Sequence, residues 1–144
     1  MTTPIAATRG RLIVIEGGDA SGKRTQSHKV LEHLSRVQAS KDRSSPAPAL
    51  CSYPRYSTEL GDVSLGLLRH RIVVNSSEGS RLDREQAHLL QCALTVDRLR
   101  HWPWVSGQLA SGSDVVLDRH WPSGVVYGSV EGVDEGELMA EGLV

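Results

Sequence analysis

Residues 12–26 read LIVIEGGDASGKRTQ, and this stretch decides the fold. It opens with four apolar, largely β-branched residues, which predict a buried β-strand. Glycines and other small residues follow, and a helical pattern begins at Lys23. Small residues let backbone N–H groups close around phosphate oxygens, and the start of the next helix adds a positive dipole end. Strand, glycine loop, lysine and helix in this order therefore predict a phosphate-binding loop.

Lys23 stands where it can reach the terminal phosphates of a bound nucleotide. The usual signature ends in Lys-Ser or Lys-Thr, because a hydroxyl at that place holds Mg²⁺. Here Arg24 fills the place, and Thr25 comes one residue later as a displaced candidate for the Mg²⁺ ligand. The alternative interpretation is a glycine-rich strand-to-helix turn that binds nothing. The joint occurrence of strand, loop and helix argues against that alternative.

The length of the chain is that of one ordinary domain. The chain has 144 residues, with 16 Lys and Arg against 17 Asp and Glu and a net charge of −1. This balance favours neither a nucleic-acid partner nor a membrane surface, and no apolar run approaches membrane-spanning length. Residues 1–11 lack the apolar core of a secretory signal. Cys51 and Cys92 are too few for a disulfide framework or a zinc site, which indicates a cytoplasmic location and leaves the nucleus and the mitochondrion open.

The rest of the chain alternates helical and strand patterns. Strand, helix and strand in succession are typical of the parallel βαβ unit, so we predict an α/β fold with a parallel sheet. Apolar residues at helical spacing and short β-branched runs define the elements. The predicted strands span 12–16, 49–53 and 115–117, and the predicted helices span 23–37, 58–72, 83–102 and 104–111.

Capping and breaking residues place several boundaries. Asp83 with Gln86 three residues later predicts a capping box, and Pro103 predicts the end of that helix. Residues 123–128 fit either the start of a further helix or a tight loop. Residues 131–144 carry acidic side chains and no basic one, which predicts a solvated acidic tail without order. Polar loops or turns are predicted at 40–48 and 75–80.

The helix predicted over 83–102 carries charge on its apolar face. Asp97 and Arg98 continue the stripe that is formed by Ala87, Leu90 and Leu94. Charged groups on a buried stripe are costly without partners, so each needs an ion pair or a ligand. A salt bridge between neighbours at the helix end is one interpretation, and ligand binding is the other.

Polar residues follow the predicted strands at their carboxyl ends. Glu16, Tyr53 and the pair Asp118-Arg119 occupy these places. In open α/β sheets, ligands bind outside the carboxyl ends of the strands. These side chains are therefore expected to converge on one site.

At these positions the chain resembles the thymidylate kinases, which transfer the γ-phosphoryl group of ATP to dTMP. A glycine loop alone would indicate only a superfamily, but the Asp inside it and three later stretches narrow the resemblance. The resemblance rests on EGGDASGKRTQ at 16–26, YPRYSTELG at 53–61, Asp97-Arg98, and DRH at 118–120 with Ser123, Gly124 and Tyr127.

The resemblance implies a fold, a cofactor and an assembly. The implied fold is the P-loop NTPase three-layer sandwich with a parallel sheet, forming a single kinase domain over 1–144. Family members are longer, so the lid and the C-terminal strands are expected to be missing, which would leave the first strand at a sheet edge. ATP is the implied co-substrate, dTMP the acceptor and Mg²⁺ the cofactor. A homodimer is implied through the helices near Thr58 and Asp83.

The resemblance also implies roles for individual residues. Arg55 and Arg119 would hold the dTMP phosphate, Arg98 would point at the thymine carbonyl, and Asp118 would act near Mg²⁺. Cations suit this chemistry, because phosphoryl transfer depends on positioning and on charge stabilisation. The implied catalytic residues are Lys23, Asp19, Arg119 and Asp118. The implied ATP-binding residues are Gly17, Gly18, Ala20, Ser21, Gly22, Lys23, Arg24 and Thr25. The implied dTMP-binding residues are Asp19, Tyr53, Arg55, Leu94, Arg98, Arg119, Ser123, Gly124 and Tyr127.

Two further positions depart from the family pattern. Ala20 stands where one class of the family has a catalytic Arg, which implies a cation supplied by the lid instead. Leu94 stands where an aromatic residue would stack on thymine. Stacking on a base contributes about 1–3 kcal/mol, so base affinity or selectivity is expected to be weaker.

Three functional hypotheses remain at this point. The first is a thymidylate kinase or its N-terminal two thirds. The second is another P-loop enzyme, such as a nucleoside monophosphate kinase of different base specificity; a GTPase is disfavoured because no Asn-Lys-x-Asp motif occurs. The third is a nucleotide-binding fragment or interaction module without catalysis.

Overall fold

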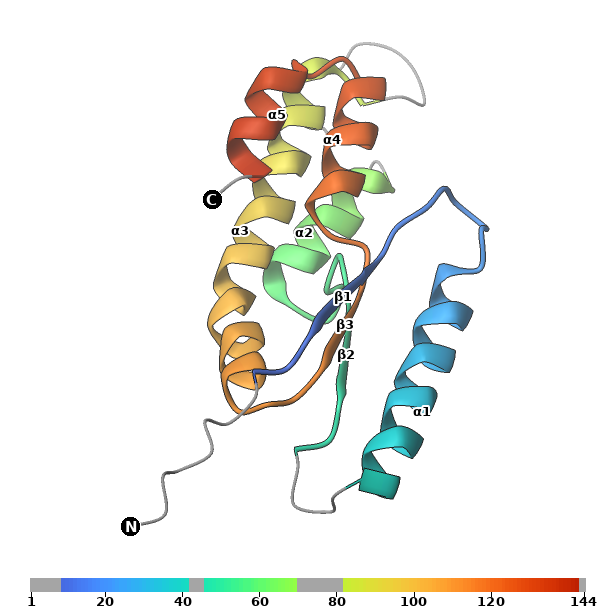
Figure 1. Ribbon diagram of the computed structural model, residues 1–144. Helices are drawn as coiled ribbons and strands as arrows, with labels where there is room; N and C mark the ends of the chain where they lie inside the picture. The colour runs from blue at the N-terminus through green and yellow to red at the C-terminus, as the bar shows by residue number, and fades with distance from the viewer. Residues whose placement is uncertain (1–8, 42–45, 70–81, 143–144) are drawn as a thin grey trace. The chain divides into compact units, whose positions relative to one another are not determined.

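The computed structural model describes residues 9–41, 46–69 and 82–142 (Figure 1). Its described residues form two compact units. The first unit takes those within 1–51 and 102–118, and the second takes those within 52–101 and 119–144. A single domain over 1–144 stays a prediction.

A three-stranded sheet forms the centre of the first unit. Strand β1 (Leu12–Ile15) pairs in parallel with β3 (Val115–Asp118), and β2 (Ala49–Ser52) lies on the other side of β3. The register places Leu12 beside Val115 and Ile15 beside Asp118. The predicted α/β fold with a parallel pairing and all three predicted strands are confirmed.

Strand β1 is less buried than the sequence predicts. Among the described residues β1 has one neighbour, β3, and so forms an edge of the sheet. Leu12 and Val14 are 38% and 39% exposed, whereas the three valine and leucine residues of β3 are fully buried. The expectation that the first strand lies at a sheet edge is confirmed for the described residues. The prediction that it is buried was wrong, because burial depends on the strand's neighbours, which composition does not specify.

Helix α1 (Lys23–Lys41) follows the glycine loop and packs against β1 and β3. Its buried face includes Ser27 and Leu34. The helix runs past its predicted end at Val37, and the Gln38 side-chain amide donates a hydrogen bond to the Pro46 carbonyl oxygen. That contact ties the C-terminal part of α1 to the chain before β2.

The second unit begins with a capped helix, α2 (Glu59–Leu68). The Thr58 hydroxyl accepts a hydrogen bond of 3.1 Å from the Gly61 backbone N–H, which satisfies one of the orphan donors of the first turn. Leu67 is fully buried. The predicted helix start is confirmed, whereas Ile72 and the predicted turn at 75–80 lie outside the described residues.

Helix α3 (Arg84–Ala110) is longer than the sequence predicts. The capping box is confirmed, because Gln86 N donates to Asp83 Oδ1 at 2.8 Å and Asp83 N donates to Gln86 Oε1 at 3.2 Å. The predicted end at Pro103 was wrong, and the separate helix over 104–111 is the last part of α3. Pro103 removes one backbone donor on an exposed part of the helix, and buried Val105 and Leu109 hold the turns that follow.

Residues 121–142 form two helices, α4 (Trp121–Val130) and α5 (Glu135–Gly142), which pack together. Of the two alternatives for 123–128, the helix is confirmed. The predicted acidic tail without order was wrong over 135–142, because Leu138 packs against the core around Ala87 and Val133. Asp134 Oδ1 also accepts hydrogen bonds from the backbone N–H groups of Gly136 and Glu137 at the start of α5. No described helix combines the length and apolarity that crossing a bilayer requires.

Two helix glycines are expected to respond in opposite ways to alanine. A Cβ on Gly61 would lie 1.9 Å from the Arg55 carbonyl oxygen, which is a backbone atom that cannot move aside cheaply. Gly61→Ala should therefore lower the free energy of unfolding by about 3 kcal/mol. Gly107→Ala is the matched control, because no atom lies within 4 Å of its Cβ position, and it should raise stability by about 0.5–1 kcal/mol. Urea denaturation checks both, and equal effects would contradict the packing argument.

Candidate functional site

The loop between β1 and α1 has the backbone of an anion-binding turn. Ala20 and Gly22 have φ values of 57° and 80°, in the left-handed region. Non-glycine residues in this region are uncommon and cluster at functional sites. Gln26 N donates to Gly22 O at 3.0 Å, which is the first hydrogen bond of the helix. The N–H groups that precede Gln26 in the first turn of α1 therefore have no acceptor within the helix. That turn contains no acidic side chain, so no carboxylate competes for the positive end of the helix.

Lys23 is 9% exposed and lies over its own loop. Its ammonium group donates to the Gly18 carbonyl oxygen and lies 3.4 Å from Ser21 Oγ. Among the described residues it makes no ion pair. A nearly buried ammonium group without a carboxylate is costly unless an anion arrives, so the loop and lysine together fit a bound phosphate. Arg24 and Thr25 are exposed on the same first turn.

Asp118 ends β3 directly beside Ile15, at the place where the loop leaves β1. Its Oδ1 is buried and makes no hydrogen bond to any described residue, and the same is true of Ser27 Oγ on α1. Mg²⁺ prefers hard oxygen ligands and takes one or two carboxylates together with substrate phosphates. An orphaned carboxylate oxygen near this loop fits such an ion, whereas the described residues contain no cluster of three or more metal-binding side chains.

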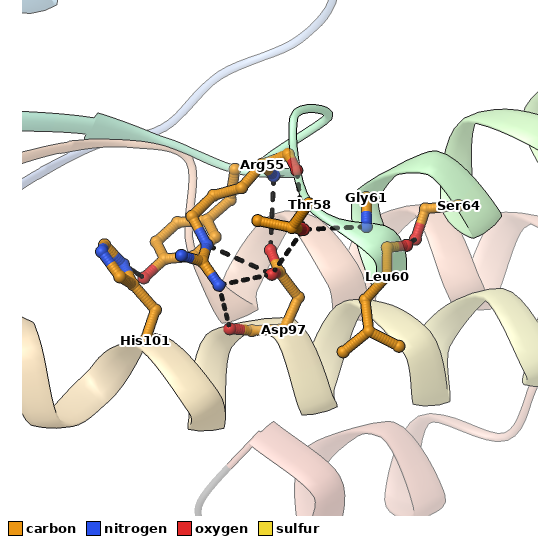
Figure 2. Close-up of polar contacts among 8 residues, drawn as sticks. Arg55, Thr58, Leu60, Gly61, Ser64, Asp97 and His101 are labelled. Atoms are coloured by element: carbon orange, nitrogen blue, oxygen red, sulfur yellow. Dashed lines mark hydrogen bonds and ion pairs between the residues drawn. The ribbon is translucent and has the colours of Figure 1, made fainter.

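In the second unit, the buried carboxylate of Asp97 lies at the centre of a polar cluster (Figure 2). Arg55 Nη2 lies 2.7 Å and Arg55 Nε lies 3.1 Å from Asp97 Oδ1, and Asp97 is 1% exposed. The Thr58 hydroxyl lies 3.2 Å from the same oxygen. Asp97 therefore has an ion pair, as one interpretation expected, but its partner comes from the segment after β2 and not from a neighbour on its own helix.

Tyr53 and two histidines lie beside this ion pair. The Tyr53 hydroxyl and His101 Nδ1 are 2.8 Å apart, and the Tyr53 ring meets both His101 and His120 edge to face. Burial lowers the pKa of His101 below its usual value, the Arg55 charge lowers it further, and Asp97 opposes both effects. Burial and the Arg55 charge thus favour the neutral form of the His101 ring. No pattern in the sequence singled out His101, because its partner lies 48 positions away.

Residues from α3 and α4 meet at Gly124. A Cβ on Gly124 would lie 3.1 Å from Gln91 Oε1 and 3.4 Å from Arg98 Nη1. Arg98 Nη2 also lies 2.9 Å from Thr95 Oγ1. Leu94 lies on α3 between Gln91 and Arg98 in sequence and is half-buried. Gln91 is 3% exposed, and it lies against Gly124 and Gly128 of α4.

Arg119 follows β3 with a φ of 69°. Its guanidinium carbon lies 5.2 Å from the centre of the Tyr127 ring, and Arg119 Nη1 lies 3.4 Å from Ser123 Oγ. Arg119, Ser123 and Tyr127 are therefore brought together, as the sequence implied. A strained backbone at a cation in this position is the kind of feature that accompanies ligand binding.

The predicted site residues fall into two sets. The loop residues 17–25 and Asp118 belong to the first unit, and the described ends of β1 and β3 are neighbours there. The second set belongs to the second unit. The convergence of both sets on one site stays a prediction. The second set comprises Tyr53, Arg55, Leu94, Arg98, Arg119, Ser123, Gly124 and Tyr127.

Comparison with known proteins decides the family. The sequence model of the thymidylate kinase family matches residues 15–141. The chain belongs to the thymidylate kinase family. Similar relatives include a thymidylate kinase of Caenorhabditis elegans, 33% identical over 129 residues, and one of Homo sapiens, 33% identical over 123 residues. These alignments cover 88% and 85% of this chain and 54% and 50% of the relatives, so the chain spans about half of their length.

A solved thymidylate kinase structure from Candida albicans matches this family member with a TM-score of 0.63 at 23% identity. The match covers 92% of this chain and 54% of that chain. The similarity confirms the P-loop NTPase fold that the sequence predicted.

Removal of the buried carboxylate should destabilise this family member strongly. Asp97→Ala leaves the Arg55 guanidinium and the Thr58 hydroxyl without their shared acceptor, so the free energy of unfolding should fall by about 3 kcal/mol. Glu32→Ala is the matched control, because the Arg36–Glu32 pair spans 3.3 Å on an exposed helix face. That change should cost less than about 1 kcal/mol. Equal losses in urea denaturation would contradict the buried ion pair.

Stability should fall in mild acid because of His101. The folded-state pKa of His101 lies below its usual value of 6.5, so the unfolded chain takes up its proton first as pH falls. The contribution of His101 is complete above about pH 6.5 and is lost as pH falls toward the lowered pKa. His101→Gln keeps an acceptor for Tyr53 but does not titrate, so its stability should decline less between about pH 7 and pH 5.5. His88→Gln, at an exposed position on the same helix, should decline as the wild type does.

Proposed function

We propose that this chain carries the nucleotide-binding part of a thymidylate kinase, which transfers the γ-phosphoryl group of ATP to dTMP. In this reaction an oxygen of the dTMP phosphate bonds to the γ-phosphorus, the bond from that phosphorus to the β–γ bridging oxygen breaks, and ADP and dTDP leave. The observation that carries the proposal is the nearly buried Lys23 ammonium group, held over a glycine loop at a helix start with no ion-pair partner among the described residues. Family membership supplies the reaction class.

In the proposed enzyme the loop binds the ATP phosphates. Its backbone N–H groups and Lys23 would surround the β- and γ-phosphates, with Gly17, Gly18, Ala20, Ser21 and Gly22 lining the turn and Arg24 and Thr25 at its helical end. Asp19 would face the acceptor. A preformed set of donors costs no reorganisation as negative charge redistributes during transfer, which is the main source of catalysis in phosphoryl transfer.

The acceptor phosphate would be held by Arg55 and Arg119. Support comes from the geometry of Arg55: its hydrogen bonds to Asp97 use Nε and Nη2, and Nη1 makes none to the described residues. A guanidinium has five donors, so Arg55 can hold Asp97 and an anion at the same time. Asp97 thereby orients the cation in advance of binding.

Mg²⁺ would be held by the ATP phosphates and Asp118. The orphaned Oδ1 of Asp118 supports this assignment, and the exposed Thr25 is a second candidate ligand. When bound, the ion neutralises charge on the phosphates. The negative charge of Asp118 would also help to retain the ion on the loop side of the site.

A homodimer belongs to the same proposal. Apolar side chains remain exposed on α2 and α3, the helices that the resemblance implicates in assembly. On α3 their positions fall on a repeat of three to four residues and so share one helix face. The exposed residues concerned are Val63, Leu68, Leu89, Val96 and Leu99.

A reducing intracellular compartment remains the expectation from the two isolated cysteines.

The direct test is a coupled assay of ADP release with ATP, Mg²⁺ and each nucleoside monophosphate in turn. Lys23→Ala should reduce dTMP-dependent turnover by at least about 100-fold, because the cation that stabilises the transferred phosphoryl group is lost. Lys29→Ala is the matched control on an exposed face of α1 and should turn over as the wild type does.

Unchanged turnover in Lys23→Ala would contradict the loop's role. Selective turnover of another monophosphate would favour the kinase of different base specificity that Leu94 leaves open. Binding of ATP without any turnover would favour the nucleotide-binding module without catalysis.

A further inference from the structure

We infer that His101 is a positioning residue for acceptor binding, which acts through the Tyr53 hydroxyl to hold the segment that carries Arg55. This inference rests on the proposed function, because it assumes that Arg55 binds the acceptor phosphate. Neither the sequence pattern nor the resemblance gave His101 a role. The observation behind the inference is the 2.8 Å contact between the Tyr53 hydroxyl and His101 Nδ1.

Helix α3 contacts the segment after β2 at two places. At the first, the Asp97 carboxylate accepts hydrogen bonds from the Arg55 side chain at 2.7 and 3.1 Å and from the Arg55 backbone N–H at 3.3 Å. At the second, His101 contacts the side chain of Tyr53. Residues four apart lie on the same face of a helix, so Asp97 and His101 hold the segment from one face of α3 (Figure 2).

A second anchor matters because of how Arg55 meets Asp97. Both short hydrogen bonds of the guanidinium end on the same oxygen, Asp97 Oδ1. A single shared acceptor fixes the plane of a guanidinium less firmly than two separate acceptors do. The Tyr53–His101 contact adds a fixed point two residues earlier in the chain. The direction in which Arg55 presents its remaining donors therefore depends on both anchors.

The chemistry of the Tyr53–His101 pair suits a fixed contact. Tyr53 is 6% exposed, and the two rings meet edge to face with their centroids 5.8 Å apart. A phenolic hydroxyl both donates and accepts, and a neutral imidazole has one donor and one acceptor, so the pair can hydrogen-bond in either tautomer. Burial and the Arg55 charge lower the pKa of His101, which favours that neutral ring.

The Tyr53 ring also lies close to the second cation that the proposed function assigns to the acceptor. The ring meets His120 edge to face, with the centroids 5.8 Å apart, and His120 directly follows Arg119. A shift of Tyr53 would therefore disturb the surroundings of both Arg55 and Arg119. The glycine loop belongs to the first unit, so the loss is expected in binding of the acceptor and not in binding of ATP.

The test measures binding of dTMP and of ATP by titration calorimetry, so that catalysis is not needed. Tyr53→Phe removes the hydroxyl and keeps the ring. It should weaken dTMP binding about fivefold, the size expected for one hydrogen bond between neutral groups, and leave ATP binding unchanged. His101→Leu should do the same. His88→Leu, at an exposed position earlier on α3, is the matched control and should bind both nucleotides as the wild type does. Circular dichroism checks that every variant is folded.

Two further variants separate positioning from a general loss of structure. His101→Asn should bind dTMP within about twofold of the wild type, because its amide can donate or accept near the place of Nδ1. The double variant Tyr53→Phe with His101→Leu should bind dTMP no more weakly than either single variant, because both changes remove the same hydrogen bond.

Unchanged dTMP affinity in Tyr53→Phe would overturn the positioning role, as would losses that add in the double variant. Equal weakening of ATP and dTMP binding, or no recovery in His101→Asn, would overturn it too. In each of these cases the wild-type chain still binds dTMP, so the proposed function stands. Failure of the wild-type chain to bind dTMP at all would overturn the acceptor assignment on which the inference rests.

Discussion

A buried carboxylate requires partners, and in the second unit the side chain of Asp97 imposes this constraint on everything around it. Arg55 supplies the charge, and Thr58 supplies a hydroxyl within 3.2 Å. Thr58 is also the cap of α2, so the same residue begins a helix and solvates the ion pair. The close approach of Gly61 to the Arg55 backbone completes the arrangement, since any side chain at 61 would push the segment away from Asp97. The need of one buried charge on α3 for partners thus accounts for the conformation of residues 55–61.

The first unit depends on a different constraint, the strained loop after β1. Ala20 adopts a left-handed backbone conformation, and Lys23 is nearly buried with no carboxylate partner among the described residues. Both are expected of a loop whose conformation is organised around an anion, because preorganised donors avoid reorganisation when charge redistributes. The orphaned oxygen of Asp118 beside the same loop follows the same logic for a cation.

Both units contain polar groups with unused charge or hydrogen-bonding capacity, and these are the groups to which the proposed function assigns ligands. In the first unit they are the Lys23 ammonium group, which has hydrogen bonds but no ion-pair partner among the described residues, and the buried Oδ1 of Asp118. In the second unit, Arg55 Nη1 makes no hydrogen bond to a described residue. Satisfied polar groups next to them, such as the capping box at 83 and 86, serve structure only. The distinction between the two kinds depends on whether a partner lies within hydrogen-bond distance, which only coordinates reveal.

The sequence by itself determined the elements whose causes are local. The loop signature at 16–26, the capping box and the positions of the three strands follow from residues close together in the chain, and four such local stretches together indicated the kinase family. Only the tertiary structure decided the continuation of α3 through Pro103, the order of residues 135–142 and the partner of Asp97. The continuation of α3 depends on the burial of Val105 and Leu109, and the order of residues 135–142 depends on the contact of Leu138 with Ala87. The ion pair joins Arg55 and Asp97, which are 42 positions apart. Burial and pairing are properties of the folded neighbourhood, and a linear pattern can state that a charge needs a partner without saying which residue it is.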